Sequence, residues 1–192
     1  MTSSRPYHHG NLRTELIEAG IDLLNSEGFK GFSLRKVAIK CSVSHTAPYS
    51  HFKDIDALIG AMSEYVTRQF MEELSHSITG EKDGQNAVLL MGQAYINFFQ
   101  KNPQYFQFLY YHSGIHIHLD KEMPDDYPPF ALFRATAYKM FDQKSFPKYL
   151  YPEILASLWS KVHGIVALLT NPNIHYSGDW QQVFKNMVES IQ

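Results

Sequence analysis

The sequence is poor in cysteine and in long apolar runs. Its single cysteine, Cys41, forms no intrachain disulfide, which excludes a disulfide-stapled secreted domain and suits a reducing compartment. No run approaches the roughly 18 consecutive apolar residues of a transmembrane helix. The opening residues, MTSSRPYHHGNLR, lack the apolar core of a secretory signal. We therefore expect a cytoplasmic protein without a membrane partner.

The chain is instead rich in apolar and aromatic side chains. They make up 44% and 14% of its 192 residues, and a chain of this length buries roughly 70% of its unfolded surface without a metal or a disulfide. Residues 1–53 carry seven basic and four acidic side chains, a net of +3, whereas the remainder carries a net of −5. A basic head on an acidic body indicates a polyanionic partner for the head, although such an imbalance is also within ordinary scatter.

Hydrophobic residues recur at helical spacing along almost the whole chain. The first apolar stripe begins at Leu12 and is expected to end at Gly28, a natural left-handed stop, while Ser33, Ser44 and Asp54 suit the N-caps of later helices. Helices are predicted over residues 12–27, 33–40, 44–50, 54–79, 88–99, 103–112, 130–141, 152–169 and 179–191, with a loop over 113–129. No alternation typical of strands is present. The predicted fold class is all-α, with about nine helices.

No Pro- or Ser-rich linker divides the chain. We therefore place the boundary at the start of the long fourth helix, with one domain over residues 1–53 and a second over 54–192.

Residues 33–40 and 44–50 predict two short helices joined by a tight turn, behind one packing helix. A helix-turn-helix of this kind lays its second helix in the major groove of DNA. The second helix offers many hydrogen-bonding side chains, and Pro48 at its fourth position loses at most one backbone bond. Short polar helices are also common on surfaces that bind nothing, so this pattern alone leaves both readings open.

The segment FSLRKVAIKCSVSHTAPYSHFKDIDAL, residues 32–58, closely resembles the DNA-binding segment of the tetracycline-repressor-like (TetR) family of bacterial transcriptional regulators. The matching elements are Phe32-Ser33, Val37-Ala38, Val43-Ser44, Tyr49, His51-Phe52 and Leu58. The run PYHHGNLR, residues 6–13, is similar to the lead-in of one branch of that family. The run WSKVHG, residues 159–164, resembles a signature in the ligand-binding domains of the same branch.

The resemblance implies a homodimer that reads a near-palindromic operator in double-stranded DNA, with its two recognition helices about 34–36 Å apart. Carried over position by position, it implies base contacts from Arg35, His45, Thr46 and Ala47. It also implies phosphate contacts from Ser33, Tyr49, His51 and Lys53, with Ser44 on the same DNA-binding surface. An arm with Arg5, His8 and His9 is a further candidate for contact with the backbone or the minor groove. Phe52 is expected in the core.

Three positions depart from the family pattern. Ile55 stands where a lysine usually contacts a phosphate, so we expect a salt slope lower by about one unit. Ser42 replaces a common turn glycine, and Cys41 replaces a small core residue. For Cys41, a packing role is favoured over a redox role.

The second domain supplies many aromatic residues, most of which are expected simply to form a core. The resemblance also implies a small-molecule pocket there, whose occupation releases the DNA; an inducer acts only by binding the DNA-incompetent state better. The candidate lining residues are Tyr95, Phe99, Phe106, Tyr110, Trp159 and His163. Trp159 and His163 share a helix face because they are four residues apart. The alternative for His163 is a core histidine bonded to a carbonyl.

The last two long helices are expected to form the dimer interface, as in the family. Their apolar faces, including Leu155, Leu158, Val162, Ile165 and Val166, look too wide for internal contacts alone, and Gly164 would permit close approach of a partner helix. The alternative is that these faces all point inward.

Two other classes of function compete with a ligand-responsive regulator. His112, His116 and His118, with Asp120, suggest a metal-dependent enzyme, but Gly114 and the run after Asp120 favour a solvated loop. The sequence has no HExxH motif, phosphate-binding glycine loop or nucleophile signature, so we expect no catalytic residues, no metal and no cofactor. A helical interaction module that has lost DNA binding is the other alternative, supported only by Ile55.

Overall fold

The computed structural model describes residues 12–123 and 127–190. Over these residues the chain forms eight α-helices, two short 3-10 helices and no strand, which confirms the all-α prediction. The α-helices are α1 (Leu12–Gly31), α2 (Leu34–Lys40), α3 (Ile55–Ser77), α4 (Gly84–Lys101), α5 (Pro103–Tyr111), α6 (Pro128–Gln143), α7 (Tyr151–Leu169) and α8 (Trp180–Glu189). The 3-10 helices are η1 (Ala47–Ser50) and η2 (Lys148–Leu150).

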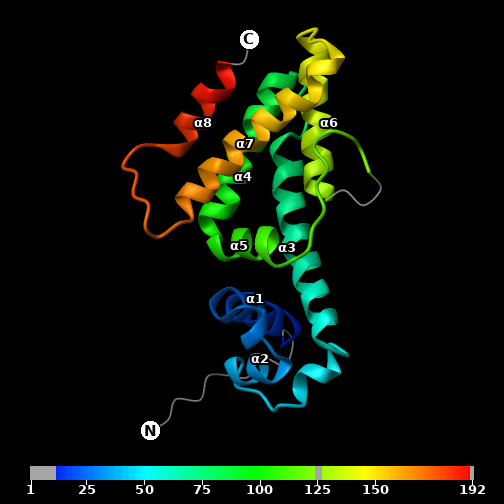
Figure 1. Ribbon diagram of the computed structural model, residues 1–192, viewed down its shortest axis with the longest axis vertical. Coiled ribbons are helices and arrows are strands. Elements are labelled where there is room, and N and C mark those ends of the chain that lie inside the picture. The colour runs from blue at the N-terminus through cyan, green and yellow to red at the C-terminus, as the bar shows by residue number, and fades with distance from the viewer. Residues whose placement is uncertain (1–11, 124–126, 191–192) are drawn as a thin grey trace.

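The helices form a head and a body (Figure 1). The head consists of α1, α2 and η1, and the body consists of α4 to α8. Helix α3 runs from the head into the body, where it packs on α4 and α6. Helix α5 lies across the near end of the body and packs against α1 of the head. None of the helices in the described ranges is long and apolar enough to cross a bilayer.

Side-chain capping bonds are present at the starts of four α-helices in the described ranges: α2, α3, α4 and α8. The Ser33 hydroxyl accepts from the Lys36 amide at 3.3 Å, and the Asp54 carboxylate accepts from the Ala57 amide at 2.8 Å. Both satisfy amides that have no partner inside their own helix. Both caps were predicted. At Gly28 the backbone turns to a φ of 66°, where a left-handed residue was expected, but helical structure resumes and α1 continues to Gly31.

The predicted helix over residues 44–50 is wrong in kind and in extent, because only the 3-10 helix η1 forms there. The Ala47 amide donates to Ser44 O at 3.0 Å and the Tyr49 amide to Thr46 O at 3.1 Å, both spanning three residues. Pro48 has no amide hydrogen to give Ser44 the α-helical bond. Ser44 is therefore not an N-cap; its hydroxyl hydrogen-bonds that of Thr46 at 3.1 Å. This difference also accounts for eight α-helices rather than nine.

Helix α4 is the centre of the body, since it packs against α3, α6, α7 and α8. Its approach to α8 is close: a Cβ added at Gly92 would lie 2.0 Å from Phe184 Cε1. Five apolar residues of α7 that were expected to form a wide partner-binding face are instead buried in this core: Leu155, Leu158, Val162, Ile165 and Val166.

Candidate nucleic-acid interface and effector cavity

The head has a small apolar core, which we call the apolar base, on which η1 packs. Leu34, Val37 and Ala38 of α2 are buried against α1, and Phe52, only 3% exposed, closes the base behind η1. The Arg13 guanidinium lies 5.4 Å from the centre of the Phe52 ring. Phe52 is thus a packing residue, as predicted, and the side chains around η1 are left to face outward.

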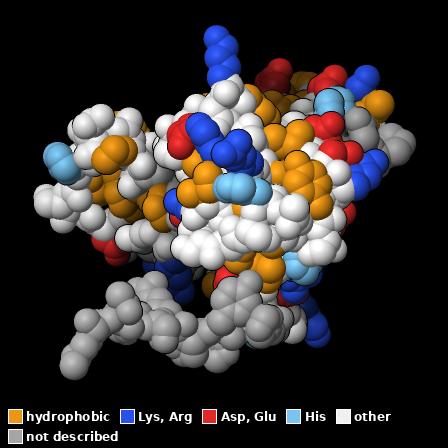
Figure 2. Space-filling model, turned by 90° about the horizontal axis from the view of Figure 1, so that it is seen from below, with side chains coloured by type: hydrophobic (Ala, Val, Ile, Leu, Met, Phe, Trp, Pro, Cys, Tyr) orange, Lys and Arg blue, Asp and Glu red, His pale blue; other side chains and the backbone are white. Residues whose placement is uncertain are grey.

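The predicted DNA-contacting residues lie mainly on the surface. Ser33 and Ala47 are partly buried, and the following are exposed: Arg35, Ser44, His45, Thr46, Tyr49, His51 and Lys53. Tyr49 is 60% exposed. Seen from the head end, Lys, Arg and His side chains lie among apolar side chains and the white atoms of the backbone and of uncharged polar side chains (Figure 2). Such a mixture supplies both cations for phosphates and hydrogen-bonding groups for base edges.

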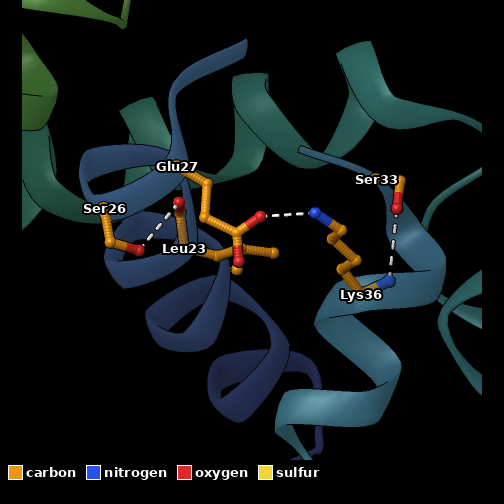
Figure 3. A network of polar contacts seen from close by, with 5 residues as sticks. All are labelled: Leu23, Ser26, Glu27, Ser33 and Lys36. Carbon is orange, nitrogen blue, oxygen red and sulfur yellow. Dashed lines mark hydrogen bonds and ion pairs between the residues drawn. The ribbon is translucent and has the colours of Figure 1, made fainter. Parts of the chain in front are cut away.

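Ion pairs distinguish the basic side chains of α2 from one another. The Lys36 ammonium reaches across to the Glu27 carboxylate of α1 (Figure 3), and Lys40 pairs with Asp22 at 3.4 Å. Arg35 is exposed and has no ion pair among the residues that the structure describes. Of these three cations, Arg35 is the one that DNA meets without first displacing a carboxylate.

The departures from the family pattern have visible consequences. Ser42 adopts a φ of 58°, a left-handed conformation that disfavours side chains and explains why a glycine suits this turn. Ile55, the first residue of α3, is partly buried against the core. The Cys41 thiol lies 3.5 Å from Glu15 O, and burial raises its pKa, so it is a poor nucleophile. The arm residues Arg5, His8 and His9, and the lead-in up to Asn11, lie outside the described residues.

All six predicted effector residues meet in one cluster in the body. They come from three helices: α4 provides Tyr95 and Phe99, α5 provides Phe106 and Tyr110, and α7 provides Trp159 and His163. The rings of Trp159 and His163 stack with centroids 5.3 Å apart, and Phe106 lies 5.0 Å from His163. The shared face expected from their four-residue spacing is therefore present.

A chain of hydrogen bonds crosses this cluster. The Tyr95 hydroxyl donates to the Tyr110 hydroxyl at 3.1 Å and lies 3.0 Å from His163 Nδ1. Burial raises the pKa of both tyrosines well above the usual value of 10 and lowers the pKa of His163 below 6.5. All three groups are therefore uncharged at neutral pH. The hydrogen-bond partner of His163 Nδ1 is thus a tyrosine hydroxyl and not a backbone carbonyl.

A cavity of about 20 Å³ adjoins the cluster, and Tyr95, Tyr110 and Trp159 form part of its wall. Sequence reasoning missed most of the remaining wall, which includes Phe70, Tyr127, Phe130, Phe133 and Phe184. These residues come from α3, the loop before α6, α6 itself and α8. Helical spacing predicts burial of the four phenylalanines, whereas Tyr127 lies in the segment predicted as a loop. No local signal distinguishes a residue beside a cavity from one in a filled core.

Helix α5 touches the cluster on one face and the head on another. Toward the head, the Tyr105 hydroxyl donates to the Glu18 carboxylate, and the Asn25 amide donates to Gln104 O at 2.7 Å. Phe29 of α1 meets His112, directly after α5, in an edge contact with centroids 5.5 Å apart. A displacement of α5 by a bound molecule would therefore act directly on α1.

The histidine-rich segment has a structural role. His112 packs against the head, and the backbone carbonyl of His118 accepts from the buried Arg134 guanidinium. Within the described ranges, no group of three His, Cys, Asp or Glu side chains is placed to hold a metal ion.

Comparison with known proteins gives two matches to family models. Residues 16–62 match the model for bacterial regulatory proteins of the tetR family, and residues 88–191, more than half of the chain, match the model for the tetracyclin repressor-like C-terminal domain. The chain belongs to the TetR family. Members of this family are DNA-binding transcription factors and not enzymes, so the hypothesis of a metal-dependent enzyme is rejected.

Individual relatives agree with this assignment. An HTH-type transcriptional regulator of Bacillus subtilis, YobS, is 25% identical over 92 residues, and the nucleoid occlusion factor SlmA of Vibrio cholerae is 29% identical over 94. Each alignment covers 48% of both chains, so the chain spans about half the length of the curated relatives it matches.

Solved structures share the fold over nearly the whole chain. A TetR-family regulator from Bordetella parapertussis has a TM-score of 0.72 at 13% identity, covering 94% of each chain. FadR from Bacillus subtilis, solved in complex with stearoyl-CoA, has a TM-score of 0.66 at 11% identity, covering 92% of this chain and 95% of its own.

Proposed function

We propose that this TetR-family regulator is a homodimeric repressor that leaves a near-palindromic operator when a small molecule occupies the cavity in its body. Residues 1–53 would form the DNA-binding domain and residues 54–192 the ligand-binding and dimerisation domain. The observation that carries the proposal is the exposed polar surface around η1, which packs on α2, the helix of Arg35. The head with this surface is joined to an aromatic cavity through α5.

In this proposal the surface residues of the head have two roles, contact with base edges and contact with phosphates. Arg35, His45, Thr46 and Ala47 would contact base edges, with Arg35 donating to a guanine and the Ala47 methyl meeting a thymine methyl. Tyr49, His51 and Lys53 would hold phosphates, together with Ser33 and Ser44. Ser33 keeps this capacity because its oxygen accepts from Lys36 N while its own hydrogen remains available to a phosphate oxygen.

The outer face of α7 supports the dimer. Ser157 and Ser160 are exposed, and Leu168 is 41% exposed on the same side. A Cβ added at Gly164 would meet no atom within 4 Å, so this face is open to a partner helix. Small side chains at the crossing let two helices approach closely. A second copy would use this face, together with the exposed Met187 of α8, as a self-complementary surface.

Release would follow from the position of α5. A ligand in the cavity displaces rings of the cluster, and Tyr110 and Tyr105 lie on the same nine-residue helix. Movement of α5 alters its contacts with Glu18 and Asn25, and with them the spacing of the two heads. The ligand lowers operator affinity only by its preference for the altered state.

Selection of bound fragments from random double-stranded DNA at two salt concentrations tests the proposal. We expect a palindrome whose half-sites are about one duplex turn apart, and a steep fall of affinity with salt. Recovery of no consensus would favour a helical module without DNA binding, and a consensus without twofold symmetry would contradict the dimer.

Two variants test the residue roles on the selected operator. Arg35→Ala should weaken binding by about 10-fold or more and relax one base position, because a bidentate guanine contact is lost. Lys53→Ala should weaken binding evenly over all sequences and reduce the salt slope by about one unit. Lys101→Ala, an exposed lysine of the body, is the matched control. Unchanged binding by both head variants, with the dimer intact, would contradict the assigned contacts.

A further inference from the structure

The wall of the cavity is aromatic and uncharged. Of the fourteen wall residues in the described part of the chain, eight are aromatic and none carries a charge. A carboxylate or an ammonium group buried there would lose its hydration and would find no ion-pair partner among the wall residues, which is a heavy cost. The wall therefore favours a neutral molecule.

Aromatic walls can also bind organic cations, which lie over the ring faces. The Arg134 guanidinium already lies 5.0 Å from the centre of the Phe130 ring. Trp159 meets Phe130 at 88° and Tyr95 at 84°, so these rings pair edge to face with one another. The ring faces used in these contacts are not free for a cation, and a neutral ring that joins the edge-to-face packing is the better fit.

The hydrogen bonds of the tyrosine hydroxyls at the cavity indicate which polar group a ligand must carry. The single hydroxyl hydrogen of Tyr95 goes to Tyr110, so His163 Nδ1 must donate to the Tyr95 oxygen. The hydroxyl hydrogen of Tyr110 then has no acceptor among the described residues. The same holds for Tyr127, whose hydroxyl accepts from the Thr67 hydroxyl at 3.3 Å. Both tyrosines line the cavity, and burial raises the pKa of both, so they remain donors.

We propose that the cavity binds a neutral aromatic compound with a hydrogen-bond-accepting oxygen, for which an aryl ketone is the simplest example. This inference rests on the proposed function, because it names the chemistry of the molecule that the cavity takes. The oxygen accepts from Tyr110, Tyr127 or both, while the ring packs against Trp159.

The size of the cavity adds a second feature. About 20 Å³ accommodates roughly one water molecule, so even a single-ring ligand must displace side chains. Trp159 and Tyr110 are the partly exposed residues of the wall, so these two rings have the most room to move. A ligand that bonds Tyr110 thereby acts on α5, the helix that contacts the head.

Four one-ring probes separate the possible ligand classes: acetophenone, ethylbenzene, benzoate and benzyltrimethylammonium. They share a phenyl ring and differ in whether they carry an acceptor, no polar group, a negative charge or a positive charge. Binding to the full chain is followed by calorimetry and by the fluorescence of Trp159 in a Trp180→Phe variant, since the chain has two tryptophans. We expect acetophenone to bind at least about 5-fold tighter than ethylbenzene, as one hydrogen bond provides, and both charged probes to bind more weakly than either.

Single hydroxyl deletions test the assigned donors. Tyr110→Phe and Tyr127→Phe should each weaken acetophenone binding by about 3- to 10-fold and leave ethylbenzene binding unchanged. Tyr149→Phe, at a tyrosine that is 78% exposed, is the matched control. Each variant keeps its ring, and its melting curve establishes that it is folded.

Several outcomes would overturn the inference. They are a preference for ethylbenzene or for a charged probe, no binding of any probe up to its solubility limit, or hydroxyl deletions that leave acetophenone binding intact. Operator binding is measured in the same samples without a probe. If the unmodified protein binds the operator but the order of probe affinities is wrong, only the ligand class is refuted. If the unmodified protein does not bind the operator at all, the proposed function is refuted.

Discussion

The contact between α4 and α8 gives a sharp prediction, because it depends on the missing side chain of one buried glycine. A Cβ at Gly92 would lie 2.0 Å from Phe184 Cε1 and 2.1 Å from Cζ, whereas ordinary contact begins at 3.4 Å. The Phe184 ring, 2% exposed, is enclosed by the core. In Gly92→Ala the ring or the whole of α8 must therefore retreat by about 1.4 Å, the difference between those two distances.

The expected magnitude combines two opposing terms. Overpacking of this kind costs about 1–3 kcal/mol, and replacing glycine by alanine inside a helix stabilises by about 1 kcal/mol. Gly60, on α3, isolates the second term because a Cβ there meets no atom within 4 Å. Gly60→Ala should raise the free energy of unfolding by about 1 kcal/mol, and Gly92→Ala should lie about 2 kcal/mol below it.

Urea unfolding at one fixed protein concentration measures both variants, since a dimer's stability depends on concentration. A Phe184→Leu background completes the test: with the ring removed, Gly92→Ala should lose its penalty and show a coupling energy of about 2 kcal/mol. If Gly92→Ala is as stabilising as Gly60→Ala, or has the same effect in both backgrounds, the close approach of α4 and α8 is refuted.

Three further perturbations test other parts of the molecule. Ser42→Gly should stabilise the chain by about 0.5–1 kcal/mol, because it relieves a side chain held at a φ of 58°; a lower urea midpoint would contradict this. Gly164→Arg should convert the dimer to a folded monomer by light scattering, while Gly60→Arg, also in open space, should not; equal dimerisation would place the interface elsewhere. Burial lowers the pKa of His163, so the unfolded chain takes up its proton first as pH falls. Stability should then decrease below about pH 6.5, and His163→Gln should flatten the urea midpoint between pH 7.5 and 5, whereas an unchanged slope would exclude His163 as the cause.

Sequence reasoning reached furthest where the controlling interactions are local. The caps at Ser33 and Asp54 were predicted because each bond joins residues three apart, and the start of α5 at Pro103 follows from the fixed φ of proline. The same locality explains one failure. Pro48 was expected to remove only one hydrogen bond from an α-helix. In a segment this short the loss of that bond is enough, and the remaining amides bond carbonyls three residues back, so only a 3-10 helix forms.

The candidate sites divide in the same way. Arg35 and the polar residues around η1 could be identified as DNA-contact candidates from the sequence, because the residues of this exposed surface lie close together in the chain. Which lysines are held by acids, as Lys36 is by Glu27, depends on how α1 crosses α2. The six effector candidates were identified by residue type and family resemblance, but their common cluster requires three helices to converge.

The sequence by itself determined the eight α-helices of the described residues, the order of head and body, and the residue types that face solvent, because hydrophobic period and capping act over a few residues. Only the tertiary structure decided that α7 turns its most apolar face inward, that Tyr110 and Tyr127 both bring a hydroxyl to the cavity wall, and that α5 joins this cavity to the head. Those outcomes depend on packing between residues far apart in the chain, where many arrangements satisfy the same local pattern and the total fit of the core selects one.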